Sequence, residues 1–320
     1  MITTYDKKSM HQKFESPLDF QTFDKTLSID ILNIIYLFLD FDHLCKILFV
    51  NKNMNNLVTP NYNKIKKNII NQKYRNIIYY DAVKNNQFIS INFLTHLKVN
   101  YCNDGLKIAA GLNNQKMVDY MILKGANDFN SAMISATENN HINMIEYMIS
   151  KGANDWDSVI AIASKNNNKA IIDYMISKGA NNWNWAMAYA AVNNHKEIID
   201  YMIFKNANNW NWAMTNAAEN NHKKIVEYLI SKGADDLNSA MINAAKNNHK
   251  KIVEYLISKG ANDFDLAMAY AAGNNHNEMV EFMILNGAND WDLAIKYAAG
   301  NNHYEMVDFL ISKAIKKYIQ

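Results

Sequence analysis

The sequence contains few of the features that mark a secreted or membrane-spanning protein. Only two of its 320 residues are cysteine, Cys45 and Cys102, too few for a disulfide framework and in keeping with a reducing compartment. The longest apolar run, Ile31–Leu39, is far shorter than the roughly 20 residues that cross a bilayer. Residues 1–16 carry charges and no apolar stretch of the kind found in signal peptides. We therefore expect an intracellular protein without a membrane segment.

An excess of charge of one sign is also missing. The 33 Lys plus Arg nearly balance the 31 Asp plus Glu, which leaves a formal net charge of +2. Nucleic-acid binders usually concentrate positive charge, so no nucleic-acid partner is expected. No nucleophile elbow, phosphate-binding loop, paired-cysteine spacing or group of catalytic carboxylates occurs. We therefore expect neither enzymatic activity nor a cofactor.

The chain does repeat itself, with a period of 27 residues. Histidines recur at one phase of this period, and Asn168, Asn114 and Gln87 occupy the same phase in other repeats. Self-similarity over so many copies is the signature of a repeat architecture. The pattern runs from about residue 74 to residue 313, which gives about nine repeats. The in-phase histidines are His141, His195, His222, His249, His276 and His303.

Each repeat contains two short helical patterns separated by an Asn-Asn pair, which favours a turn. The first helix is rich in small residues, as in Trp185–Ala191. An Asn or Asp precedes it, and these side chains accept hydrogen bonds from the free backbone N–H groups of a first turn. We expect this residue to cap the first helix. The set comprises Asn130, Asp157, Asn184, Asn211, Asn238, Asp265 and Asp292.

The second helix has an apolar stripe and ends at glycine. Ile225, Val226 and Leu229 share one side of it. Gly233 follows, where a left-handed residue is expected. Each second helix also contains an acidic residue, which we interpret as a charge that stabilises the helix N-terminus. These acids include Asp119, Glu146, Asp173 and Asp200.

A single pair of ~10-residue helices cannot bury its apolar side alone. The repeats must therefore stack, each covering the next. The sequence predicts an all-α helical solenoid of about nine helix-turn-helix repeats.

The repeated run AMxxAAxNNHxxIVEYLISKGAN resembles the ankyrin-repeat consensus over about three quarters of the chain. Ankyrin repeats have about 33 residues, and the residues missing here fall between the helix pairs, where ankyrins carry β-hairpin fingers. The resemblance therefore implies an ankyrin-type solenoid without full fingers, which binds another protein through the concave face lined by its first helices. The short, Asn-rich repeats are similar to those of ankyrin proteins from large DNA viruses of amoebae. This similarity implies a viral protein of the host cytoplasm.

The segment before the repeats differs from them. Leu27–Val58 resembles the F-box pattern, although Ser28 replaces the usual proline and Met54 the usual tryptophan. The resemblance implies docking on a Skp-type adaptor of a cullin-RING ubiquitin ligase, with the repeats holding the target. The alternative is a helical cap that covers the apolar end of the solenoid. The residues implied in docking are Leu27, Ile31, Leu32, Ile35 and Leu39.

These interpretations divide the chain into five parts. They are an N-terminal tail over 1–23, the F-box-like segment over 24–60, a linking helix over 61–73, the repeat array over 74–313 and a C-terminal helical cap over 314–320.

Two tryptophans stand out as candidate binding residues. Trp185 and Trp212 occupy a position that is Ser or Leu in other repeats, so the repeat itself does not require them. Large aromatic side chains often dominate binding energy. By contrast, the second residue after each Gly-Ala-Asn is almost always aromatic and is expected to pack between repeats. Trp185 and Trp212 should therefore be more exposed than Trp156, Trp183, Trp210 and Trp291.

The position after the Ala pair of the first helix varies while its neighbours do not, which indicates a solvent-facing site. We predict partner-binding residues there, the alternative being an ordinary solvated surface. The column comprises Glu138, Lys165, Val192, Glu219, Lys246, Gly273 and Gly300.

The in-phase histidines are not expected to bind metal. Stacked helices lie 8–10 Å apart, whereas ligands that share a zinc ion lie about 2 Å from it. We expect these histidines to form hydrogen bonds at the start of the second helix.

Overall fold

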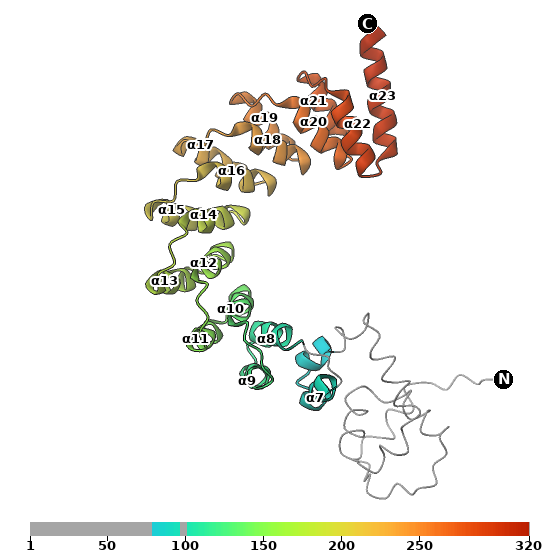
Figure 1. Ribbon diagram of the computed structural model, residues 1–320. Helices are drawn as coiled ribbons and strands as arrows, with labels where there is room; N and C mark the ends of the chain where they lie inside the picture. Colours follow the sequence, from blue (N-terminus) through green and yellow to red (C-terminus); the bar gives the residue numbers. More distant parts are fainter. Residues whose placement is uncertain (1–78, 97–100, 320) are drawn as a thin grey trace, which may run out of the picture. The chain divides into compact units, whose positions relative to one another are not determined.

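The computed structural model describes residues 79–96 and 101–319 (Figure 1). The chain divides into two compact units, residues 1–100 and residues 101–320. In the first unit the described residues form a helix over 79–84 and helix α7, Phe88–His96. The predicted tail (1–23), F-box-like segment (24–60) and linking helix (61–73) lie outside the described residues.

The second unit is a series of eight helix pairs. All regular secondary structure in the described ranges is helical, and no strand interrupts the connections between pairs. The prediction of an all-α array whose repeats lack β-hairpin fingers is therefore confirmed for this part. The first helices are α8 (Cys102–Gly111), α10 (Phe129–Glu138), α12 (Trp156–Lys165), α14 (Trp183–Val192), α16 (Trp210–Glu219), α18 (Leu237–Lys246), α20 (Phe264–Gly273) and α22 (Trp291–Gly300). The second helices are α9 (Gln115–Leu123), α11 (Ile142–Ser150), α13 (Lys169–Lys178), α15 (Lys196–Phe204), α17 (Lys223–Lys232), α19 (Lys250–Ser258), α21 (Asn277–Leu285) and α23 (Tyr304–Ile319).

Two turns with left-handed residues set the length of each repeat. After α16 the chain turns at Asn221 (φ +63°), and the N–H of His222 bonds to the carbonyl of Ala217 at 2.9 Å. After α17 it turns at Gly233 (φ +113°), and the N–H of Ala234 bonds to the carbonyl of Leu229 at 3.0 Å. In both turns the preceding helix is closed by the same kind of hydrogen bond, from a backbone N–H to the carbonyl oxygen five residues earlier. Asn and Gly are the residues that adopt a positive φ most readily.

The core forms between neighbouring repeats. In most first helices small alanines flank a larger apolar residue, as Ala213 and Ala217 flank Met214, and these three residues are fully buried. Each second helix from α9 to α21 buries three apolar residues, such as Ile225, Val226 and Leu229. Burying one large apolar side chain stabilises the fold by roughly 1.5–3 kcal/mol. The stack therefore supplies the burial that an isolated helix pair lacks.

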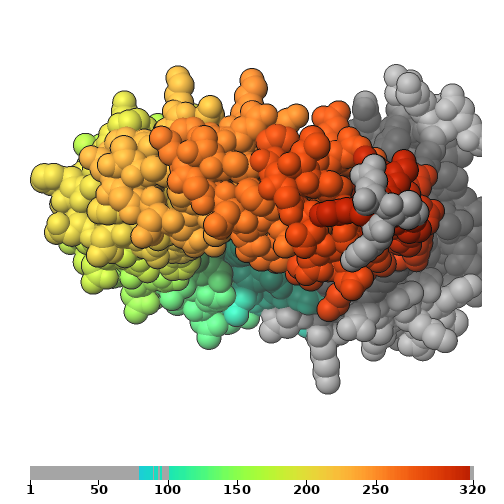
Figure 2. Space-filling view, turned by 90° about the horizontal axis from the view of Figure 1, so that it is seen from above, coloured from blue at the N-terminus to red at the C-terminus, as the bar shows by residue number. Residues whose placement is uncertain are grey.

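The small residues also bring the first helices close together. Each first helix contacts the next along the second unit, whereas the second helices contact one another much less. As a result the first helices lie on the inner side of the arc that this unit follows in Figure 1, with the second helices outside. In the space-filling view the yellow and orange repeats lie against one another as one continuous band (Figure 2).

A side-chain acceptor on each first helix fastens the loop of the following repeat. Oδ1 of Asn211 accepts hydrogen bonds from the backbone N–H groups of Asp235 and Asp236 at 2.8 and 3.1 Å. The same pair of bonds, 2.6–3.1 Å long, occurs at all seven junctions between the eight pairs. We call these residues the loop acceptors. They are Asn103, Asn130, Asp157, Asn184, Asn211, Asn238 and Asp265.

The prediction that the repeated Asn or Asp caps its own first helix is therefore wrong. The helix begins two residues earlier than expected, so Asn211 is its second residue and its side chain reaches the next repeat. The cap lies two residues before it, where Oδ1 of Asn209 accepts from the N–H of Trp212 at 3.2 Å. The capping residues are Asp128, Asp155, Asn182, Asn209, Asp236, Asp263 and Asp290.

The histidines form hydrogen bonds at the start of the second helix, as predicted, but with the preceding repeat. Nε2 of His222 lies 2.9 Å from the carbonyl oxygen of Val192, thirty residues earlier. His195, His249 and His276 make the equivalent contact at 2.9–3.0 Å. Each of these side chains therefore joins two repeats rather than closing its own turn.

The acids of the second helix also bond between repeats. Asp119, Asp173 and Asp200 lie in the second turn of their helices, so the assignment of these acids as N-terminal charges is wrong, and it is wrong for Glu146 as well. The hydroxyl of Tyr201 donates to Asp173 at 2.8 Å. Tyr147 and Tyr228 donate to Asp119 and Asp200 in the same way.

The C-terminal end departs from the repeat. Ala314 replaces the glycine that ends most of the other second helices, and α23 continues without a break to Ile319. The predicted C-terminal helix over 314–320 is thus an extension of the last second helix rather than a separate element. No helix in the described ranges is both long and apolar enough to cross a membrane.

Substitution of a left-handed asparagine should separate backbone strain from side-chain contacts. We expect Asn221→Ala to lower the free energy of unfolding by about 1 kcal/mol, because a Cβ-bearing residue other than Asn adopts this conformation unfavourably. Asn221→Gly should change it by less than about 0.5 kcal/mol. Urea unfolding of both variants tests this, and equal losses for Ala and Gly would contradict it.

Candidate protein-binding surface

The side of the first helices that faces away from the core is the candidate surface. The third, seventh and tenth residues of a helix share one side because they are four and three residues apart. In α14 these are Trp185, Tyr189 and Val192, whereas Ala186, Met187 and Ala190 on the opposite side are fully buried. We call this surface the inner face, with a third, a seventh and a tenth column. From α10 to α22 the tenth column is the variable column of the sequence, Glu138 to Gly300.

The two candidate tryptophans lie on the inner face, in its third column, with different exposure. Trp212 is 40% exposed, whereas Trp291 between repeats is only 7% exposed. Trp185 is half-buried, like Trp156, Trp183 and Trp210. The expected difference thus holds for Trp212, and Trp185 is more exposed than Trp291.

A neighbouring aromatic ring accounts for the lower exposure of Trp185. Its ring meets that of Tyr189 edge to face, with centroids 6.0 Å apart. Beside Trp212 the equivalent residue is Asn216, which is smaller and polar. The structure thus adds Tyr189 to the candidate surface, a residue that the sequence alone did not single out.

The aromatic residue that starts each first helix packs at the junction of two repeats. A Cβ added to Gly233 would lie 3.1 Å from Cζ3 of Trp210, so this ring lies directly over the turn. Nε1 of Trp210 is buried and has no hydrogen-bond partner among the described residues. The position therefore uses the volume of the indole and not its N–H, in agreement with the packing role expected from the sequence.

The tenth column is exposed at three of its seven positions, so the predicted solvent-facing site is found only in part. Glu138, Lys165 and Gly300 are exposed, and Val192, Glu219 and Lys246 are half-buried. Gly273 is the exception: it is buried, and an added Cβ would lie 3.3 Å from Nδ2 of Asn301 in the next repeat.

Charged residues on the second helices are engaged within the array. Lys196 pairs with Asp200 at 2.7 Å, and its ammonium group lies 4.2 Å from the ring centre of Tyr228. Lys232 approaches the same ring at 5.3 Å. Lysines approach the equivalent rings of Tyr201 and Tyr255 in the same two ways. These charges therefore have a structural role.

The environment of Tyr228 shifts two pKa values. Partial burial, followed by the hydrogen bond to Asp200 and its negative charge, raises the pKa of Tyr228 to about 12. Partial burial would raise the pKa of Asp200. The hydrogen bonds from Lys196 and Tyr228 outweigh this effect and lower that pKa below its usual value.

Charged residues on the inner face lack such partners. Within the described residues, the side chains of Glu138, Lys165, Glu219 and Lys246 make no ion pair or hydrogen bond. At four successive repeats the backbone carbonyls of the tenth column, from Lys165 to Lys246, accept the histidine bonds. The backbone of this column thus holds the stack together while its side chains remain available.

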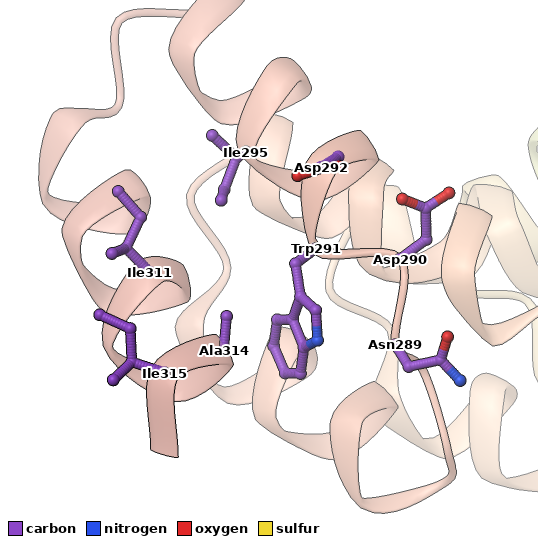
Figure 3. Close-up of a pocket in the computed structure, with 8 residues that line it drawn as sticks. All are labelled: Asn289, Asp290, Trp291, Asp292, Ile295, Ile311, Ala314 and Ile315. Carbon is purple, nitrogen blue, oxygen red and sulfur yellow. The ribbon is translucent and has the colours of Figure 1, made fainter. Parts of the chain in front are cut away.

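A shallow pocket lies at the C-terminal end of the array, between α22 and α23 (Figure 3). It measures about 280 Å³ and is lined by Trp291, Ile295, Ile311 and Ile315, with Asp292 at its edge. Residues equivalent to Ile295, such as Met268, are fully buried by the next repeat, whereas Ile295 is half-buried. The pocket is therefore the uncovered side of the last repeat rather than a specialised ligand site.

No three His, Cys, Asp or Glu side chains in the described ranges come close enough to hold a metal ion. Four of the in-phase histidines, His195, His222, His249 and His276, instead contact four different carbonyl oxygens, each at its own junction.

The comparison with protein families agrees with this architecture. The family model for ankyrin repeats in three copies matches residues 106–184, 133–211, 159–239, 187–267 and 241–320. The chain therefore belongs to the ankyrin-repeat family, whose members are typically non-enzymatic scaffolds for protein–protein interaction. No curated protein matches the sequence.

Alkaline pH should weaken the array through its tyrosines. Because the pKa of Tyr228 is about 12 in the folded state and near 10 in an unfolded chain, its stabilising contribution is complete below pH 10 and is lost as pH rises through 12. Tyr228→Phe should therefore show a smaller loss of melting temperature between about pH 9 and about pH 11.5 than the wild type. The control is Tyr174→Phe, the equivalent position without a bonded carboxylate. Equal losses in wild type and Tyr228→Phe would contradict the assignment.

Proposed function

We propose that the protein is a non-enzymatic scaffold that binds a target protein on the inner face of its repeats. The partner-binding residues are Glu138, Lys165, Trp185, Val192, Trp212, Glu219 and Lys246. No cofactor, nucleic acid or membrane takes part in this function.

The observation that carries the proposal is the exposure of Trp212. The repeat does not require a tryptophan at the position of Trp212, which is 40% exposed, because serine occupies the equivalent position in α10, α12 and α18. Half-exposed aromatic residues that a fold does not require are typical of binding hot spots. Trp185 and Tyr189 extend the aromatic surface into the neighbouring repeat.

We also propose that the protein recruits its target to a cullin-RING ubiquitin ligase. The support is the F-box-like sequence over residues 24–60, in which Leu27, Ile31, Leu32, Ile35 and Leu39 would dock on a Skp-type adaptor. The alternative is that this segment only caps the array, which would then be a plain binding scaffold. The Asn-rich composition supports a viral origin, with the host cytoplasm as the place of action.

Replacing both tryptophans should abolish binding without affecting the fold. We expect Trp185→Ser/Trp212→Ser to remain folded with a free energy of unfolding lower by about 1.5–3 kcal/mol, because each indole is about half-buried and a fully buried apolar side chain contributes roughly 1.5–3 kcal/mol. Peptides selected from a random phage library on the intact full-length chain should lose measurable affinity for this variant. Phe204→Ser is a matched control, because Phe204 is 77% exposed on a second helix and serine replaces it in α13 and α17. Unchanged binding to the double variant would refute the proposed surface.

Substitution within the F-box-like segment should separate docking from capping. In the full-length chain, Ile31→Lys/Ile35→Lys should prevent co-elution with a recombinant Skp-type adaptor while the melting temperature of the array stays the same. If the segment is a cap, the wild type will not co-elute and the variant will melt several degrees lower. A wild type that does not co-elute would exclude the ligase role.

A further inference from the structure

The charges of the inner face follow an order along the array. From α10 to α18 the tenth column carries negative Glu138, positive Lys165, uncharged Val192, negative Glu219 and positive Lys246. Gly273 and Gly300 end the column without charge. Two pairs of opposite charge, with the same polarity, thus flank an apolar centre.

The same apolar centre contains the exposed aromatic residues. The third and seventh columns beside Val192 hold Trp185 and Tyr189, and Trp212 follows in the next repeat. None of the residues in these two columns from α10 to α22 is charged. The charged residues of the tenth column and the aromatic residues of the third and seventh columns therefore form two parallel rows on adjoining turns of the first helices.

The stack itself does not account for these charges. On the second helices, Lys223 pairs with Glu227, and Lys313 pairs with Glu281 at 2.9 Å. The four charged side chains of the tenth column make no such contact within the described part of the chain. Unpaired surface charges of fixed order favour a partner with complementary charges and disfavour others.

From this arrangement we infer that the occupant of the inner face is a linear segment of another protein with a defined charge order. The segment begins with a basic residue opposite Glu138 and an acidic residue opposite Lys165. An apolar or aromatic anchor then lies at Trp185 and Trp212. A basic residue opposite Glu219 and an acidic residue opposite Lys246 complete the order. A linear segment fits because the charges form one column, a single side chain wide in each repeat. The inference rests on the proposed function and adds to it the chemistry of the partner.

The length of the segment follows from the spacing of the helices. Neighbouring helix axes lie 8–10 Å apart, so the four steps from Glu138 to Lys246 cover roughly 32–40 Å. An extended chain covers about 3.3 Å per residue, so the segment needs about 10–12 residues. Random peptides of about 16 residues are therefore long enough to probe the face.

The experiment uses the full-length chain and a phage library of such peptides. Sequences enriched on the wild type should contain an apolar anchor with an acidic residue on each side. Their affinity for Lys165→Glu/Lys246→Glu should fall at least about ten-fold. Selection on this variant should enrich basic residues at the same two positions. The matched control is Lys224→Glu/Lys251→Glu, which makes the same charge change at exposed positions of α17 and α19 and should leave affinity unchanged.

The outcomes separate this inference from the proposed function. Peptides that need Trp185 and Trp212 but bind all charge variants equally would overturn the charge order and leave the scaffold function intact. Peptides that bind the tryptophan variant and the charge variants with the same affinity as the wild type would overturn both the charge order and the proposed binding surface. If no sequence is enriched on the wild type, the occupant is not a linear segment, and the inference fails. An equal loss of affinity with the Lys224→Glu/Lys251→Glu control would show that net charge alone weakens binding, and this result would also overturn the inference.

Discussion

Each helix pair of this protein depends on its neighbours to bury its apolar side. A pair presents alanines and one larger residue from its first helix and three apolar residues from its second, and only the next repeat can cover them. This requirement fixes the period, because the faces match only if both turns return the chain to the same orientation. The left-handed Asn and Gly residues provide that return. The loop acceptors, such as Asn211, then hold the following loop in place.

The same dependence separates structural residues from functional ones. Positions that bond or pack across a junction are occupied by similar residues in repeat after repeat, as with His222 and Tyr228. Positions on the inner face differ between repeats, so the stack does not require a particular side chain there. Trp212 and the charges of the tenth column belong to this second group. Binding specificity can therefore change there at little expense to stability.

The sequence predicts the period, the two helices, the left-handed Gly233 and the absence of hairpin fingers, because each of these depends on residues close together in the chain. It does not predict the hydrogen bonds between repeats. Asn209 and Asn211 are the same residue type two positions apart, and only the start of α16 decides that the first caps its own helix while the second bonds to the next repeat. The partner of Asp200, Tyr228, likewise lies in the following repeat. The difference in exposure between Trp185 and Trp212 depends on a packed ring, Tyr189.

The last repeat still presents half of a junction. Asp292 occupies the place of a loop acceptor, and Ile295 occupies a position that other repeats cover completely. Since all seven junctions use the same bonds, duplication or loss of a 27-residue unit within the gene would create no new kind of interface. The number of repeats can therefore change during evolution without substitutions in the core, and the length of the inner face changes with it.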